Sequence, residues 1–292
     1  MHGYEELERW VQLRNAVFPD DPDSVQVLTL IRARQTGHVN LLAVDEGRPV
    51  GMAMLSDDIG PEASTHAYVE VGVVPERRGE GIGSALFHDV SQRARERGQL
   101  GLECETLVSD SRTVDWLTRR GFVEESRLRQ LVLADDDALS DAPLPKGVAL
   151  HLIGSRPDLI DGMFEVAQAA YGELYGHRPA QVSSRIEWEV YELGGAFDLD
   201  LSLVAERGGD VLGYATLLSP AGTTDAFLRM LCVLPGLDAV AAALVREQVV
   251  QARKAGRQRV LAWALSPRIE SCLTSIGSRV ADESVTLRSP LL

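Results

Sequence analysis

Three glycines at alternate positions, Gly79, Gly81 and Gly83, separate an apolar, strand-like stretch from a segment with helical periodicity. Glycine lets the backbone take positive φ angles and approach a ligand closely. The first amides of a helix have no partner inside it, and the helix dipole adds positive potential there. With the cation of Arg78 beside these glycines, the segment predicts a binding site for phosphate or pyrophosphate.

Two common phosphate-binding motifs do not match this segment. A P-loop ends in Gly-Lys followed by Ser or Thr, whereas Gly83 is followed directly by Ser84. A dinucleotide fingerprint has the spacing GxGxxG, whereas the spacing here is GxGxG. The site is therefore expected to bind its phosphates in another way.

The pattern Arg78-x-x-Gly81-x-Gly83, behind Val71-x-Val73-x-Pro75, resembles the acyl-CoA motif of the GNAT-type N-acetyltransferases. The order of the expected helices and strands agrees over about residues 4–133. The resemblance implies a mixed α/β fold with acetyl-CoA as co-substrate and no metal.

The resemblance also implies which residues hold the co-substrate. The backbone of Val71, Gly72 and Val73 would bind the acyl carbonyl and a pantetheine amide where two parallel strands separate. The pyrophosphate would lie on six consecutive amides, those of Gly79, Glu80, Gly81, Ile82, Gly83 and Ser84.

Two positions depart from the family pattern. Leu117 stands where the family usually has a tyrosine that acts as general acid, and it has no proton to donate. Asp110 stands where an asparagine usually contacts the cofactor. Its carboxylate is expected either to accept from a pantetheine amide or to cap the helix that follows.

Amine acetylation needs a base for the ammonium proton and often an acid for the leaving thiolate. Glu70, Glu103 and Glu105 are the base candidates, and the resemblance favours Glu105, where several family members place a glutamate. Glu70 lies in the strand that would present the thioester. Tyr68, two residues before it, is a candidate acid, with a core or rim tyrosine as the alternative.

These residues need a scaffold, and the hydrophobic patterns predict one. We expect a helix over 4–18, a hairpin over 40–57, a strand over 66–74, a helix over 84–97, a strand over 100–108, a short helix over 109–121 and a strand over 125–133. No strand precedes the first helix. Either it is absent or another segment, such as residues 284–292, takes its place.

The second half repeats the order of the first. Pro75 pairs with Pro235, Gly98 with Gly256, Asp110 with Ser266 and Gly121 with Gly277. The sequence thus predicts two tandem GNAT domains, 1–134 and 148–292, joined by an Asp- and Pro-rich linker over 135–147.

The second copy lacks the glycine motif. Residues 236–242, GLDAVAA, contain no arginine and no Gly-x-Gly, and Leu273 takes the tyrosine position. We expect this copy to bind no CoA. Five residues, Tyr171, Tyr175, His177, Trp188 and Tyr191, are expected either to wall an acceptor pocket or to pack in the core.

Composition limits the partners. Of 292 residues, 45% are hydrophobic and 25% charged, which is typical of globular proteins. The net charge of −14 disfavours nucleic acids and anionic membranes and suits a cationic substrate. There is no apolar span and no signal layout, and the three cysteines are far apart, so a cytoplasmic protein with reduced thiols is expected.

The sequence predicts an N-acetyltransferase that acts on a primary amine of a small molecule, rather than of a protein, by direct attack in a ternary complex. The alternatives are an acyl-CoA-binding regulatory module without turnover, or an enzyme that uses another acyl-CoA. A homodimer is compatible with the sequence.

Overall fold

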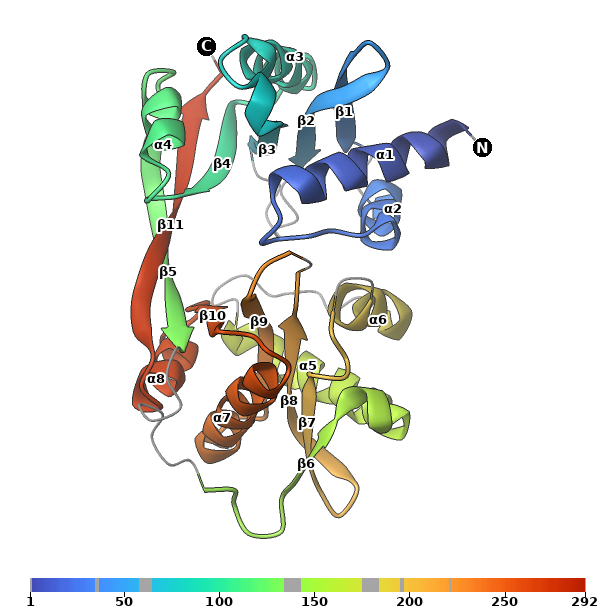
Figure 1. The fold of residues 1–292 in the computed structure, drawn as a ribbon, viewed down its shortest axis with the longest axis vertical. Coiled ribbons are helices and arrows are strands. Elements are labelled where there is room, and N and C mark those ends of the chain that lie inside the picture. Colours follow the sequence, from blue (N-terminus) through green and yellow to red (C-terminus); the bar gives the residue numbers. More distant parts are fainter. Residues whose placement is uncertain are drawn as a thin grey trace. The chain divides into compact units, whose positions relative to one another are not determined.

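The computed structural model describes residues 2–34, 37–57, 65–133, 143–174, 184–194, 197–220 and 222–291. The chain forms two units (Figure 1). The first contains residues 1–127 and 283–292, and the second contains residues 128–282. Most of the linker predicted over 135–147 lies outside the described residues.

The first unit contains a helical start followed by the predicted alternation of strands and helices. Its elements are α1 (His2–Val17), α2 (Val25–Arg34), β1 (Val39–Asp45), β2 (Arg48–Asp57), β3 (His66–Val73), α3 (Ile82–Glu96), β4 (Gly101–Leu107), α4 (Ser111–Thr118) and β5 (Val123–Leu133). A short 3-10 helix, η1 (Pro75–Arg77), follows β3. The sequence patterns did not predict α2.

The second unit repeats this order. Its elements are β6 (Ala149–Leu152), α5 (Ile160–Leu174), α6 (Arg185–Leu193), β7 (Leu203–Arg207), β8 (Asp210–Leu218), β9 (Asp225–Val233), α7 (Asp238–Lys254), β10 (Arg259–Trp263), α8 (Pro267–Ser275) and β11 (Arg279–Pro290), with 3-10 turns at Ile153–Ser155 and Pro157–Leu159.

The predicted repeat is visible in matching local geometry. Asp110 caps α4, and its counterpart Ser266 caps α8. Gly121 and Gly277, which follow these helices, both have positive φ angles, 83° and 98°. The same chain signals therefore end the same elements in both copies.

Two strands connect the units. In the first unit the strand order is β1-β2-β3-β4-β11, and in the second it is β5-β10-β9-β8-β7-β6. The chain of β5 begins in the first unit and ends in the second, and β11 does the reverse (Figure 1). Residues Gln130–Leu133 pair with β10, and Ser284–Pro290 pair with β4, both antiparallel.

This arrangement corrects two expectations. The C-terminal segment joins the first unit's sheet, but beside β4 rather than at the edge that a missing first strand would occupy; β1 forms that edge. The strand expected to close the first copy ends in the second unit instead. A strand's pairing partners depend on the whole fold, and its hydrophobic pattern does not specify them.

Helices cover both faces of the first sheet. α1 crosses β1, β2 and β3 (Figure 1) and buries Leu7, Trp10, Val11 and Leu13 against Leu28 and Met52. On the other face, α3 buries Leu86, Val90 and Ala94 against alternate residues of β2 and β3. Within the described ranges, no helix is long and apolar enough to cross a membrane.

Substitution of Leu287 tests whether β11 packs into the core of the first unit. Its side chain is 3% exposed in the first unit's core, so we expect Leu287→Ala to lower the free energy of unfolding by about 2–5 kcal/mol in urea denaturation. The control is Val280→Ala at the other end of β11, where the side chain is 55% exposed; its effect should stay below about 1 kcal/mol. Equal effects would contradict the burial of β11 beside β4.

Candidate active site

The first unit's site is organised by the separation of two parallel strands. β3 and β4 pair only over His66–Tyr68 and Gly101–Glu103, although both strands continue further. β3 stays paired with β2 as far as Val73, and β4 stays paired with β11 as far as Leu107. Beyond Tyr68 and Glu103, the facing edges of β3 and β4 are therefore not joined by this ladder.

Backbone groups of β3 point toward the open edge. Val74 donates its N–H to the carbonyl of Val50 at 3.1 Å, and the register places Gly72 opposite Met52. Antiparallel hydrogen bonds fall on alternate residues, so the N–H and C=O groups of Val71 and Val73 face away from β2. The carbonyl of Val73 accepts from Arg78 Nε at 3.0 Å, which leaves the two amides as donors at this edge.

Gly72 has a packing role. A Cβ at this position would lie 2.7 Å from Val17 Cγ1 and 3.0 Å from Phe18 Cε2. Glycine is therefore what lets the end of α1 lie directly against β3, and the residue faces α1 rather than the open edge.

The glycine-rich loop presents backbone amides. Gly79 and Gly81 have φ angles of 90° and 88°, with open space where a side chain would project. No side chain caps α3, and its first intrahelical bond runs from Ala85 N–H to the Gly81 carbonyl. The preceding amides, those of Ile82, Gly83 and Ser84, thus have no partner in the helix, and anion binding at this helix end stays a prediction.

The two arginines beside this loop differ in whether a carboxylate binds them. Arg77 is bound to Asp45 at 2.7 Å and to Glu80 at 2.8 Å. These contacts tie the β1–β2 hairpin to the loop and neutralise the one carboxylate within it. Hydrogen bonding to Arg77 lowers the pKa of Glu80. Arg78, held at the Val73 carbonyl, has no carboxylate contact among the described residues.

Glu70 lies in a buried ion pair on the face of β3 that meets α1. Arg14 donates from Nε to Oε1 and from Nη2 to Oε2, both at 2.9 Å. The two side chains are 7% and 13% exposed. Arg14 also bonds Asp21, through the backbone carbonyl and, at 3.1 Å, the carboxylate. Burial raises the pKa of Glu70, and the attraction of Arg14 opposes that rise.

Tyr68 shares a strand face with Glu70, because side chains alternate along a strand. Burial, followed by the charges of Glu70 and Glu105, raises the pKa of Tyr68 well above its ordinary value. The phenol therefore keeps its proton at neutral pH. Glu105 is exposed on β4, 3.4 Å from Thr286 Oγ1. Glu103 is instead bound to Arg288 at 2.7 Å.

The two positions that depart from the family pattern have structural partners. Asp110 accepts from the Thr113 N–H at 3.1 Å and from its hydroxyl at 2.6 Å, which is the capping arrangement. Leu117 is 5% exposed in the core. Contact between Asp110 and a cofactor stays a prediction. Within the described ranges no group of three or more possible metal ligands occurs.

Comparison with known proteins establishes the family. The model of the Acetyltransferase (GNAT) family matches residues 5–122. Over 111 residues, 36% of this chain, the sequence is 36% identical to aminoglycoside N(6′)-acetyltransferase type 1 from Stenotrophomonas maltophilia, covering 69% of that protein. The chain belongs to the GNAT acetyltransferase family. It is an acyltransferase, and acetyl-CoA is the co-substrate that this family uses.

Solved structures match nearly the whole GNAT chain. A GCN5-related N-acetyltransferase from Sphaerobacter thermophilus has a TM-score of 0.60 and 18% identity, covering 99% of this chain and 93% of that one. A tandem GNAT protein from the clavulanic acid biosynthesis pathway has a TM-score of 0.64 and 16% identity, covering 99% and 95%. At such identities these similarities establish the fold, which comprises two tandem GNAT domains.

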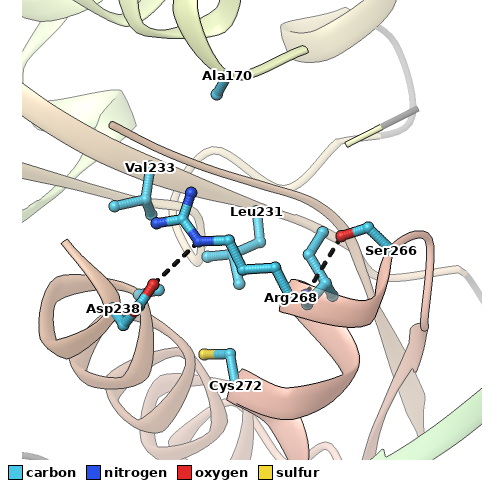
Figure 2. Close-up of a pocket in the computed structure, with 9 residues that line it drawn as sticks. Ala170, Leu231, Val233, Asp238, Ser266, Arg268 and Cys272 are labelled. Atoms are coloured by element: carbon cyan, nitrogen blue, oxygen red, sulfur yellow. Dashed lines mark hydrogen bonds and ion pairs between the residues drawn. The ribbon is translucent and has the colours of Figure 1, made fainter. Parts of the chain in front are cut away.

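The second GNAT unit keeps the strand separation but closes the space. β9 and β10 pair only over Asp225–Leu228 and Arg259–Ala262, and β9 continues to Val233. The cavity beyond them has a volume of about 30 Å³ (Figure 2). Arg268 lies across it, 2.9 Å from Asp238 in the first turn of α7. A cavity of this size holds about one water molecule.

Side chains of this unit therefore leave little free volume beside the separated strands. Cys272 also lines the cavity, and burial raises its pKa to about 11, so the thiol stays protonated. Trp188 is 2% exposed and donates to the Tyr214 hydroxyl at 3.3 Å, as part of the core. Tyr175, His177 and the Tyr171 side chain lie outside the described residues, and Tyr191 is partly buried on α6.

Sequence reasoning missed Arg14. Leu7, Trp10 and Arg14 recur at helical spacing on the buried face of α1. An arginine in such a stripe predicts a buried acidic partner, since buried charges are paired. Nothing in the pattern identifies Glu70, which is 56 positions away.

Removing one partner of the Arg14–Glu70 ion pair should lower the free energy of unfolding. Arg14→Met leaves Glu70 buried without its cation, and we expect a loss of about 3–5 kcal/mol of unfolding free energy at pH 7. Adding Glu70→Leu should restore most of it. Arg9→Met, at an exposed position on the same helix, should cost less than about 1 kcal/mol. Additive losses in the Arg14/Glu70 double mutant would contradict the pairing.

Proposed function

We propose that this GNAT protein is an N-acetyltransferase that moves an acetyl group from acetyl-CoA to an amine of a small, cationic molecule, with the first copy (residues 1–134) as the active domain. One observation carries the proposal: the open edge of β3, with the amides of Val71 and Val73, leads through the single turn of η1 into the six-amide loop at the start of α3. That continuity suits a ligand with an amide-containing arm and a pyrophosphate.

The residues on β3 suit amine acetylation. The nitrogen of a neutral amine attacks the thioester carbonyl carbon, and the carbon–sulfur bond then breaks. We assign one of the Val71 and Val73 amides to the acyl carbonyl, where it would stabilise negative charge on the oxygen, and the other to a pantetheine amide group. We assign Glu70, directly or through a water, as the acceptor of the amine proton, and Tyr68 as the donor to the leaving sulfur. Glu105 is the alternative base.

The acceptor's charge follows from the acidic groups around Tyr68 and Glu70. Asp21 and Asp23, between α1 and α2, act electrostatically on Glu70, and Asp21 and Glu105 act on Tyr68. Negative potential attracts and concentrates a cationic amine. The relative from Stenotrophomonas maltophilia is named for acetylating an aminoglycoside, which supports a small molecule with amino groups.

The second copy, residues 148–292, is proposed as a companion domain without co-substrate. The small volume of the cavity, about 30 Å³, and the Arg268–Asp238 pair support this role. We place the reaction in the cytoplasm, in keeping with the free thiols of Cys104, Cys232 and Cys272.

The direct test combines calorimetry with turnover. We expect acetyl-CoA to bind at one site per chain, and a panel of amino sugars and polyamines to contain acceptors that release free CoA thiol and gain an acetyl group by mass spectrometry. Binding without turnover would favour a regulatory module, and turnover only with a longer acyl-CoA would change the donor. Two sites per chain would contradict the role of the second copy.

The pH dependence of kcat tests the base. If Glu70 accepts the proton, kcat at saturating acceptor rises with pH as Glu70 ionises. The raised pKa of Glu70 places this limb above the range of an ordinary glutamate. Glu70→Gln should lower kcat by about 10²- to 10⁴-fold and remove the limb. If Glu105→Gln removes it instead, the assignment passes to Glu105.

Substitution of Gly83 tests acetyl-CoA binding without destabilising the fold. A Cβ there would lie 3.5 Å from Val73 Cγ2, an ordinary contact, so Gly83→Ala should fold and gain up to about 1 kcal/mol of helix stability. The added methyl should weaken acetyl-CoA binding in calorimetry. The control is Gly172→Ala, on α5 with open space around it, which should gain stability and leave binding unchanged. Equal affinity in both variants would remove Gly83 from the cradle.

A further inference from the structure

Arg120, in the turn after α4, is a fixed cation beside the glycine-rich loop. Its guanidinium stacks on the Trp116 ring, 3.5 Å from the ring centroid, and donates to the Trp116 carbonyl at 3.0 Å. Its Nη2 donates to Ser84 Oγ at 3.2 Å. Ser84 belongs to the first turn of α3, so Arg120 reaches the end of the helix where the amides are free.

The stacking surface is itself held in place. Trp116 packs edge-on against Phe87 of α3, with ring centroids 5.2 Å apart and planes at 85°. Trp116 is thereby fixed to the helix whose N-terminus the guanidinium reaches. None of the contacts that the structure describes for Arg120 is to a carboxylate. Its neighbour Arg119 adds positive charge instead.

The second copy supplies an internal comparison. Aligned on Gly98/Gly256 and Gly121/Gly277, the counterparts of Ser84, Trp116 and Arg120 are Ala242, Cys272 and Ile276. All three polar or aromatic groups are replaced in the copy that has also lost the glycine loop. Leu117 and Leu273, by contrast, are buried leucines in both copies. The fold is thus formed without the trio, and its absence accompanies the absence of the phosphate loop.

We propose that Arg120 binds a phosphate group of acetyl-CoA beside the six-amide cradle, and that Trp116 and Ser84 hold its guanidinium in place. This inference rests on the proposed use of acetyl-CoA. Arginine presents several N–H donors in a rigid plane that matches phosphate oxygens. Stacking on Trp116 restricts the side chain before the ligand arrives, which reduces the entropy lost on binding.

Calorimetry with CoA tests the proposal. A hydrogen bond to a charged group contributes enough that Arg120→Gln should raise the Kd for CoA by ~10- to 100-fold. Arg120→Lys keeps the charge without the planar fork and should give an intermediate Kd. The matched control is Arg119→Gln, which removes the same charge from the adjacent exposed position and should change the Kd by less than about threefold. Thermal melting of each variant separates lost folding from lost binding.

A second ligand identifies the phosphate. If Arg120→Gln weakens 3′-dephospho-CoA as much as CoA, the contact is to the pyrophosphate; if wild type and variant bind 3′-dephospho-CoA alike, it is to the 3′-phosphate. Both results support the proposal. Equal Kd values for Arg120→Gln and Arg119→Gln would overturn it and leave Arg120 as a cap on α4. Failure of the wild-type chain to bind CoA would overturn the proposed function as well.

Discussion

The first unit depends on one constraint, the separation of β3 from β4 after a short parallel ladder. Each strand keeps a partner on its outer side, β2 for β3 and β11 for β4. The inner edges therefore carry backbone donors and acceptors that the sheet does not use. Unpaired backbone groups are costly when buried. The proposed ligand, which has an amide-containing arm, would satisfy them without breaking the pairing of β3 with β2 or of β4 with β11.

Charges are arranged around this separation in two groups. Near the loop, Glu80 is bound by Arg77, and Arg120 contacts Ser84 in the first turn of α3. Near β3, Arg14 holds Glu70 through two hydrogen bonds in a poorly solvated position. The first arrangement favours an anionic ligand. The second fixes the geometry of a carboxylate whose pKa burial has raised.

The two copies show how the same fold is used with and without this opening. In the second unit the strands also separate, but Asp238 supplies its own carboxylate at the start of α7, and Arg268 is bound to it. An internal ion pair therefore lies at the start of α7, the helix that corresponds to α3 in the first unit. The end of β5 pairs with β10 of the second unit, and the end of β11 pairs with β4 of the first unit. Each sheet therefore includes a strand segment whose chain comes from the other copy.

The sequence alone determined the repeat, the order of the helices and strands apart from α2, and the glycine-rich turn before α3, because these depend on local properties: hydrophobic period, glycine conformation and helix ends. It did not determine the partners of β5 and β11, since a strand's pattern specifies its buried face and not its neighbour. Nor did it identify Arg14 for Glu70, or Trp116 and Ser84 for Arg120. Arg14 and Ser84 are distant in sequence from the residues they contact, and only the packing of α1 on β3 and of α4 beside α3 brings them together.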